Sequence, residues 1–312
     1  MAPWLEKTTM PTHLKELVRA RMEKTGESYQ QALRHVRAQE DHGESAPDAA
    51  ARKERVARTR SIADTAFSIA VVRAEEGPRP EAERLFEDPY ASMFAAAGAQ
   101  AAEATQRFLD LPFFRDGVRL RTRFIDDAVR DGLATGLDQV VLLGAGFDAR
   151  GLRMREISEG NARVYEVDTV EQLARKRDVL ESARVKVPAR IAYVPFDFDD
   201  PQFGTALAAA LEAKGFRRRA GAVFVWEGVI GYIGSDEIER NLCFMASEGG
   251  PRSRLAFTFG AGAFEPDTAA ARTRRAGFSS CEEIAGDELW RRYLPGDPHP
   301  NAFVMKVATA IV

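Results

Sequence analysis

The sequence predicts an α/β protein with a doubly wound, mostly parallel sheet of seven strands, of the Rossmann-like kind. Short apolar runs alternate with stretches of helical periodicity from residue 139 onward, a pattern typical of parallel sheets covered by helices on both faces. The 312 residues are 45% hydrophobic and 29% charged, as in ordinary globular domains. A glycine-rich turn follows the first apolar run, at the point where such sheets bind their ligands.

The alternation starts after an amphipathic helix that ends near Gly136. The expected elements that follow are, in chain order, strand Gln139–Leu143, strand Ala162–Val167, helix Val170–Ser182, strand Ile191–Phe196, helix Gln202–Gly215, strand Ala222–Trp226, helix Ser235–Ser247, strand Arg254–Phe259 and helix Thr268–Gly277. Two last strands, Phe278–Ile284 and Ala302–Val312, have no expected helix between them. They therefore predict a terminal β-hairpin.

The residues before the alternation predict a helical N-terminal extension and a linker. Apolar residues recur at helical spacing over 14–22 and 29–36, and helices this short are too small to form a core by themselves. We therefore expect residues 1–45 to dock or dimerise, which makes a homodimer one expected assembly. A linker with a basic helix is expected at 46–60, and the main domain at 61–312, with a helical preface before its first strand.

Charge and composition exclude several classes of function. The 44 Lys and Arg residues nearly balance the 47 Asp and Glu residues, for a net charge of −3, so no nucleic-acid partner is expected. No apolar run approaches the roughly 20 residues of a spanning helix, and no signal pattern opens the chain. We expect a cytoplasmic protein without a membrane partner. Two cysteines, Cys243 and Cys281, cannot form a zinc site or a disulfide framework by themselves, so no metal is expected.

Polar residues and glycines follow three neighbouring strands at the point where each strand ends. Gly144 and Gly146 form a turn after the first strand, where a backbone without side chains lets a ligand approach closely. Asp168 ends the second strand, 24 residues after Gly144, where a carboxylate can accept both hydroxyls of a ribose. Asp197 and the aromatic Phe198 follow the third strand and suit an adenine amine and ring. Together they predict a nucleoside site.

The nucleoside could belong to a nicotinamide dinucleotide or to S-adenosylmethionine. About 140 residues precede the glycine turn, whereas dinucleotide sites lie near the start of a domain. Asp148, at the start of the next helix, is a poor neighbour for a pyrophosphate. Glu227 follows the fourth strand and adds a further carboxylate, so the site is expected to be net acidic and to favour a sulfonium cation. A nicotinamide-dependent oxidoreductase and a non-catalytic nucleoside-binding protein remain the alternatives.

Five segments together resemble the leucine carboxyl methyltransferase family, and most closely its bacterial branch of S-adenosylmethionine-dependent methyltransferases. They are Asp88–Ala91, Arg121–Asp127, Val140–Arg150, Tyr165–Asp168 and Glu227–Tyr232. The resemblance extends from about residue 65 to the last residue. It implies a class I methyltransferase fold with S-adenosyl-L-methionine as cofactor.

The resemblance also implies a role for individual residues. Arg121, or alternatively Arg123, would hold the carboxylate of the methionine moiety, and Arg73 matches a further basic position near the active site. The remaining cofactor contacts would be Gly144 and Gly146 along the methionine backbone, Asp168 at the ribose, Asp197 with Phe198 at the adenine, and Glu227 at the amino group or the sulfonium.

The methyl acceptor is less constrained by the sequence, which identifies no catalytic residue. A hydroxyl acceptor usually needs a general base, most often histidine, whereas a carboxylate is already ionised at neutral pH. Only His299 of the four histidines lies in the expected main domain. We therefore expect an O-methyltransferase that acts on a carboxylate, or an acidic hydroxyl, of a small molecule or peptide end. Tyr232, Tyr90 and Arg73 are candidates to orient this acceptor.

Overall fold

The computed structural model describes residues 65–312 except 99–101, 112, 199 and 201. The chain divides into two units, Met1–Arg60 and Ser61–Val312, and only the second contains described residues. The predictions for residues 1–45 and 46–60, including the docking or dimerising helices, therefore lie outside the described part of the chain.

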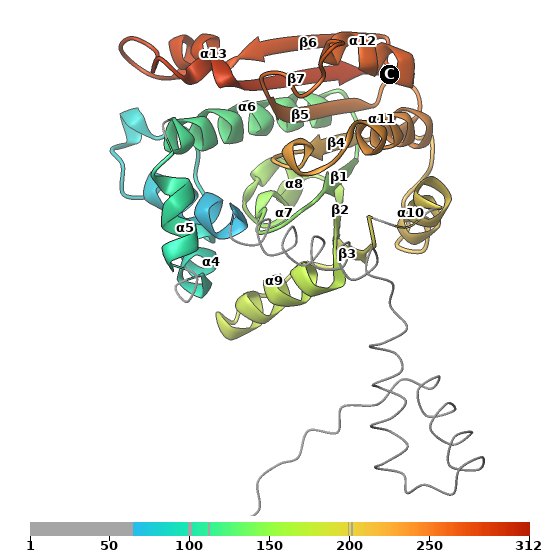
Figure 1. The fold of residues 1–312 in the computed structure, drawn as a ribbon. Helices are drawn as coiled ribbons and strands as arrows, with labels where there is room; N and C mark the ends of the chain where they lie inside the picture. Colours follow the sequence, from blue (N-terminus) through green and yellow to red (C-terminus); the bar gives the residue numbers. More distant parts are fainter. Residues whose placement is uncertain (1–64, 99–101, 112, 199, 201) are drawn as a thin grey trace, which may run out of the picture. The chain divides into compact units, whose positions relative to one another are not determined.

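The second unit contains the predicted seven-stranded sheet (Figure 1), in the order β3-β2-β1-β4-β5-β7-β6. Strands β1 to β5 are parallel, and β7 is antiparallel to both β5 and β6. The strands are β1 Gln139–Leu143, β2 Arg163–Asp168, β3 Ile191–Pro195, β4 Val223–Trp226, β5 Arg254–Gly260, β6 Ser280–Ala285 and β7 Met305–Ile311. This is the doubly wound, mostly parallel arrangement that the alternation predicted.

Helices cover both faces of this sheet, starting with one over residues 65–76. The others are α4 Ala91–Ala97, α5 Ala102–Leu109, α6 Phe114–Ala134, α7 Arg150–Arg153, α8 Arg155–Glu159, α9 Val170–Ser182, α10 Phe203–Glu212, α11 Ser235–Gly249, α12 Ala269–Ala276 and α13 Gly286–Tyr293, with 3-10 turns η1 Glu81–Glu83, η3 Ile230–Tyr232 and η4 Ala302–Val304. Within the described part of the chain, none of them combines the length and apolar character that crossing a bilayer requires.

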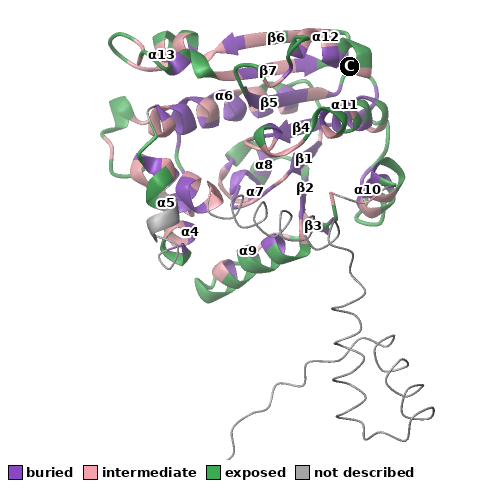
Figure 2. Ribbon diagram, in the orientation of Figure 1, coloured by how far each residue is buried: buried purple, intermediate pink, exposed green. Residues whose placement is uncertain are grey.

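The core lies on the two faces of the central strands. Val141 and Leu143 of β1 pack in the cluster that contains residues of α10, α11 and α12, whereas Val140 and Leu142 face the cluster formed with α6, α8 and α13. Side chains alternate between the faces of a strand, so a strand covered on both sides is apolar throughout. All residues of β1 and β4 are accordingly buried (Figure 2).

The end of the chain differs from the prediction in one respect. Strands β6 and β7 pair antiparallel as predicted, but helix α13 lies in the connection, where the sequence analysis expected none. Acidic Asp287 and Glu288 occupy its first turn and basic Arg291 and Arg292 its last turn, which stabilises a helix through its dipole. Only Leu289 and Gly286 are buried in α13, so its apolar periodicity was too weak to indicate a helix.

The strand order places the candidate site. Strands β1 and β4 are neighbours, and the chain continues from β1 toward β2 and β3 on one side but from β4 toward β5 on the other. Ligands of doubly wound sheets bind at such a reversal, beyond the carboxyl ends of the strands. The segments after β1, β2 and β4 therefore meet at one edge.

Candidate functional site

The glycine turn after β1 is joined directly to the end of β2. Gly144 and Gly146 have φ angles of +70° and +49°, which residues with a side chain rarely adopt. A Cβ atom on Gly144 would lie 2.5 Å from Cγ2 of Val229, so this position has no room for a side chain. The Gly146 N–H donates to Oδ2 of Asp168 at 2.7 Å. The two predicted elements of the nucleoside site are therefore in contact.

Asp168 and Asp197 lie beside each other at this edge. Asp168 is paired with Pro195 in the parallel register of β2 and β3, and the Phe196 N–H donates to the Asp168 carbonyl at 2.9 Å. Asp197, the next residue, is exposed. Phe198 is partly buried and packs edge-on against Phe196, with ring centroids 5.7 Å apart. The ends of β1, β2 and β3 thus converge as the sequence predicted.

The surroundings of Asp168 raise the pKa of its carboxyl group above the usual range. Burial raises its pKa, while the N–H groups of Gly146 and Thr169, and the charge of Lys176, lower it. Burial is the largest of these effects, so the net shift is upward.

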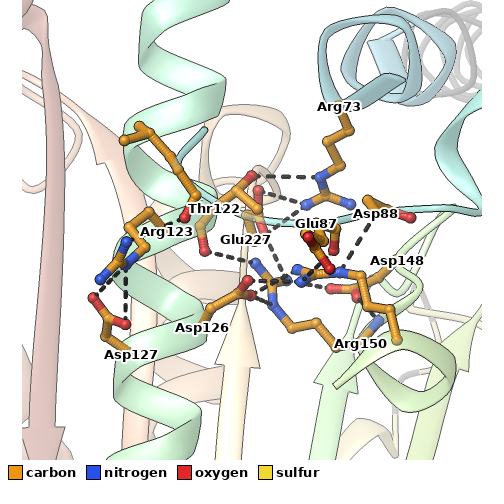
Figure 3. A network of polar contacts seen from close by, with 12 residues as sticks. Arg73, Glu87, Asp88, Thr122, Arg123, Asp126, Asp127, Asp148, Arg150 and Glu227 are labelled. Carbon is orange, nitrogen blue, oxygen red and sulfur yellow. Dashed lines mark hydrogen bonds and ion pairs between the residues drawn. The ribbon is translucent and has the colours of Figure 1, made fainter. Parts of the chain in front are cut away.

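Glu227, which follows β4, is hydrogen-bonded by three arginines from three different segments; Figure 3 labels two of them, Arg73 and Arg150. Its Oε1 accepts from Nη2 of Arg73 and from Nε of Arg121, each at 3.0 Å. Its Oε2 accepts from Nη1 of Arg150 at 2.8 Å. Burial alone would raise the pKa of Glu227, but the charges of Arg73, Arg150 and Arg121 outweigh it and hold that pKa well below its usual range. This carboxylate therefore stays ionised.

This arrangement corrects the expectation that the site is net acidic. Glu227 is paired with three guanidinium groups, and one of them, Arg150, is also paired with the carboxylates of Asp126 and Asp148, so the charges at this end of the site nearly balance. At the other end, the Asp168 carboxylate accepts from the backbone N–H groups of Gly146 and Thr169. The carboxylates at strand ends could be seen in the sequence. Arg150 was not predicted as a site residue, because its pairing with Glu227 is decided by tertiary packing.

The structure distinguishes Arg121 from Arg123, which the sequence left as alternatives. The Arg121 side chain is 14% exposed and faces Glu227, whereas that of Arg123 is 36% exposed and pairs with Asp127 at 2.9 Å. Among the described residues, Nη2 of Arg121 is buried without a hydrogen-bond partner. Gly228 packs close to it, because a Cβ there would lie only 3.4 Å from that nitrogen. Arg121 therefore has a donor available for an anionic group.

Arg150 joins this cluster to helix α6. It is fully buried, and its Nε donates to Oδ1 of Asp126 at 2.7 Å while Nη1 contacts the Asp148 carboxylate as well as Glu227. Arg153 donates to both oxygens of Asp126 at 2.7 Å. These residues lie in or beside the segments that carried the family resemblance, but the sequence analysis assigned them no role. Only their mutual spacing in the fold makes them one network.

The two candidate tyrosines have different surroundings. The Tyr232 hydroxyl lies 2.5 Å from Oγ1 of Thr65 and is close enough to Arg121 to interact electrostatically with it. Tyr90 instead packs on the apolar cluster that contains Phe67 and Phe147. The structure therefore brings Tyr232, but not Tyr90, to the arginine cluster.

Comparison with known proteins identifies the class of protein that this fold and site define. Residues 66–246 match the sequence profile of the family "Leucine carboxyl methyltransferase". The match spans more than half of the chain and includes the glycine turn, Asp168 and Glu227. The chain belongs to this family and is a methyltransferase, as the five motif segments indicated.

Curated relatives agree with this class. A protein of Streptomyces avermitilis is 33% identical over 244 residues, 75% of this chain and 78% of its own length. One of Frankia alni is 31% identical over the same shares. Both are named provisionally as S-adenosyl-L-methionine-dependent methyltransferases. Among solved structures, magnesium protoporphyrin IX methyltransferase of Synechocystis, with bound S-adenosylmethionine, is 14% identical with a TM-score of 0.42 over 72% of this chain and 98% of that chain.

Proposed function

We propose that this protein is an S-adenosylmethionine-dependent O-methyltransferase that methylates a carboxylate, or an acidic hydroxyl, of a small molecule or peptide end. The observation that carries the proposal is the different kind of polar group at the two ends of the site. Carboxylates gather at Asp168 and Asp197, and guanidinium groups gather around Glu227. S-adenosylmethionine has the matching polarity, because its nucleoside end presents hydroxyl and amine donors and its amino-acid end carries a carboxylate.

The described residues fit this methyl donor. The unpartnered Nη2 of Arg121 is suited to the methionine carboxylate, since guanidinium–carboxylate hydrogen bonds are among the strongest in proteins. The ionised Glu227 can accept from the adjacent ammonium group. Asp168 can accept from the ribose hydroxyls, and the glycine turn leaves the space that the donor backbone needs. When bound, S-adenosylmethionine supplies an electrophilic methyl group on a positively charged sulfur.

The chain's own part in the reaction is binding and alignment. Methyl transfer requires the acceptor oxygen and the methyl carbon to be held in line. Arg73 and Arg121 are held by Glu227 on one side of the site, and Asp168 is held by the Gly146 N–H on the other. Both ends are therefore positioned before any ligand binds, which reduces the entropic cost of alignment.

The guanidinium groups around Glu227 favour an anionic acceptor. A carboxylate needs no general base, whereas an ordinary alcohol does. His299, which belongs to the described residues, stacks on Phe113 with centroids 5.9 Å apart and accepts the Asn301 N–H through Nδ1 at 3.0 Å. These contacts give His299 a local structural role, so it is a poor general base.

A nicotinamide dinucleotide fits this site less well. Its pyrophosphate would need the N–H groups at the start of the helix after the glycine turn. Oδ1 of Asp148 already accepts the Arg150 N–H there at 2.7 Å. A further negative group beside this carboxylate would be repelled.

The proposal is tested by ligand titration and by methyl transfer. In calorimetry we expect S-adenosylhomocysteine to bind and NADH not to bind. With radiolabelled S-adenosylmethionine and a panel of carboxylic acids, each matched with its amide and its alcohol, we expect label to enter the acids as base-labile methyl esters. Transfer to the amides or alcohols alone would contradict the choice of acceptor. Binding of NADH without S-adenosylhomocysteine would contradict the choice of donor, and donor binding without any transfer would favour a non-catalytic protein.

A further inference from the structure

A lysine beneath the nucleoside end of the site has no role in the functions considered so far. Lys176 lies in α9 and its side chain is 0% exposed. Its ammonium donates to Oε2 of Glu166 at 2.5 Å and to the backbone carbonyl of Asp148. Glu166 is itself 1% exposed. The pair is therefore out of reach of solvent and of a ligand.

The two partners of Lys176 belong to the segments that form the donor site. Asp148 closes the glycine turn, since its N–H donates to the Ala145 carbonyl at 2.8 Å. Glu166 precedes Asp168 by two residues in β2, so both side chains project from the same face of the strand. The ammonium thus links α9, the turn and β2 directly behind the contact between Gly146 and Asp168.

A gain in stability does not by itself explain why a lysine is buried at this position. Removing an ammonium and a carboxylate from water costs several kcal/mol. A protein with an apolar pair of similar size in their place is often as stable or more stable. Only a hydrogen-bond donor, however, can hold the Asp148 carbonyl. The charge of Lys176 also favours the ionised form of Asp168, the form that accepts hydroxyl hydrogen bonds.

We propose that Lys176 is a positioning residue of the methyl-donor site, which holds the glycine turn against Asp168 through the Asp148 carbonyl. The inference rests on the proposed function, because it assumes that the nucleoside of S-adenosylmethionine binds at Asp168. Lys176 acts through the turn and does not touch the donor.

The test separates this role from a purely structural one. Lys176→Met leaves Glu166 buried without its partner, so the melting temperature should fall by about 10 °C. Lys176→Met combined with Glu166→Leu removes both charges, and most of that loss should be recovered. Even with stability recovered, the single and the double variant should each bind S-adenosylhomocysteine about tenfold more weakly than the unchanged protein in calorimetry, because the Asp148 carbonyl has lost its hydrogen-bond donor. Lys214→Met is the matched control, since Lys214 is exposed.

Hydrogen exchange gives a second measurement that does not depend on the donor. Amides of residues 144–148 should exchange faster in the double variant than in the unchanged protein and in the control. Unchanged affinity and unchanged exchange in a double variant with restored stability would overturn the proposal. If the unchanged protein did not bind S-adenosylhomocysteine, the proposed function would be wrong, and exchange at the turn would still decide whether Lys176 holds it. Titrations are made well below the lowest melting temperature.

Discussion

Two carboxyl groups of the site, Asp168 and Glu227, have pKa values displaced in opposite directions. Burial dominates at Asp168 and raises its pKa. At Glu227 burial acts in the same direction, but the charges of Arg73, Arg150 and Arg121 outweigh it and lower the pKa. Asp168 therefore gains a proton at a higher pH than an ordinary aspartate, whereas Glu227 stays ionised to a lower pH than an ordinary glutamate. The two ends of the site therefore respond differently to acid.

The first prediction concerns the pH dependence of donor binding. Asp168 accepts ribose hydroxyls as a carboxylate, so affinity for S-adenosylhomocysteine should fall as the pH decreases from neutral through the raised pKa of Asp168. Glu227 stays ionised over that range and adds no such dependence. Asp168→Asn should bind weakly at every pH and show a flatter profile in calorimetric titrations. A variant that kept the full pH dependence would assign it to another group.

A second prediction separates two neighbouring arginines. Arg121→Ala should weaken binding of S-adenosylhomocysteine, which retains the methionine carboxylate. Loss of a charge-assisted hydrogen bond costs about 1.5–3 kcal/mol, or roughly 10- to 150-fold in the dissociation constant. Arg123→Ala is the matched control, because Arg123 pairs with Asp127 away from Glu227. Equal losses in the two variants would show that Arg121 has no special contact with the donor.

At the scale of elements, the approach of α6 to β4 depends on one glycine. A Cβ on Gly132 would overlap Cγ2 of Val223, although alanine is the better helix former. This close approach brings α6, which carries Arg121 and Asp126, onto the strand that ends before Glu227.

The third prediction follows from that contact. Gly132→Ala should destabilise the fold by about 1–3 kcal/mol through overpacking, measured by chemical unfolding. In a Val223→Ala background the same change should cost much less, because the overlapping methyl group is gone. Gly204→Ala in α10 is the control, since nothing lies within 4 Å of its added Cβ, and it should be neutral or stabilising. Equal costs in both backgrounds would exclude steric overlap as the cause.

The secondary-structure elements and the side-chain contacts of the site could be predicted from the sequence to different extents. Strands β1 to β5 were predictable because each is a short, mostly apolar run between turns, whereas β6 is largely polar. The position of Gly144, Asp168 and Glu227 at strand ends followed from parallel topology. The side chains that contact the site residues could not be predicted from the sequence. Arg150 meets Glu227, 77 residues later, and Lys176 meets the Asp148 carbonyl, 28 residues earlier. Such contacts depend on packing that one sequence does not reveal.

Over the whole molecule, a buried ion network connects α6, α7 and the segment after β4. Asp126 is its centre, fully buried between Arg150 and Arg153. Burial raises the pKa of Asp126, but Arg153 and Arg150 outweigh it, and the net shift is downward. A carboxyl with a depressed pKa contributes stability above its unfolded-state pKa, and the contribution is lost as the pH falls through the folded-state pKa.

The fourth prediction tests this network. Asp126→Asn removes the carboxylate that Arg150 and Arg153 share but leaves Arg150 paired with Asp148 and Glu227, so the unfolding free energy should fall by about 3 kcal/mol at neutral pH. The difference from the unchanged protein should shrink in acid, as Asp126 itself becomes protonated. Glu159→Gln, which removes an exposed partner of Arg155, should leave the unfolding free energy nearly unchanged. A similar small effect at Asp126 would mean that the network contributes little to stability.

The order of the last strands also has a consequence for how the chain folds during synthesis. Among the strands of the described residues, β6 is hydrogen-bonded to β7 alone, and β7 separates it from β5, yet β6 is made first. A growing chain can therefore assemble β1 to β5, with the whole glycine turn and Glu227, before β7 has been made and β6 can pair with it. The ligand-binding half of the sheet can be in place before its far edge is finished.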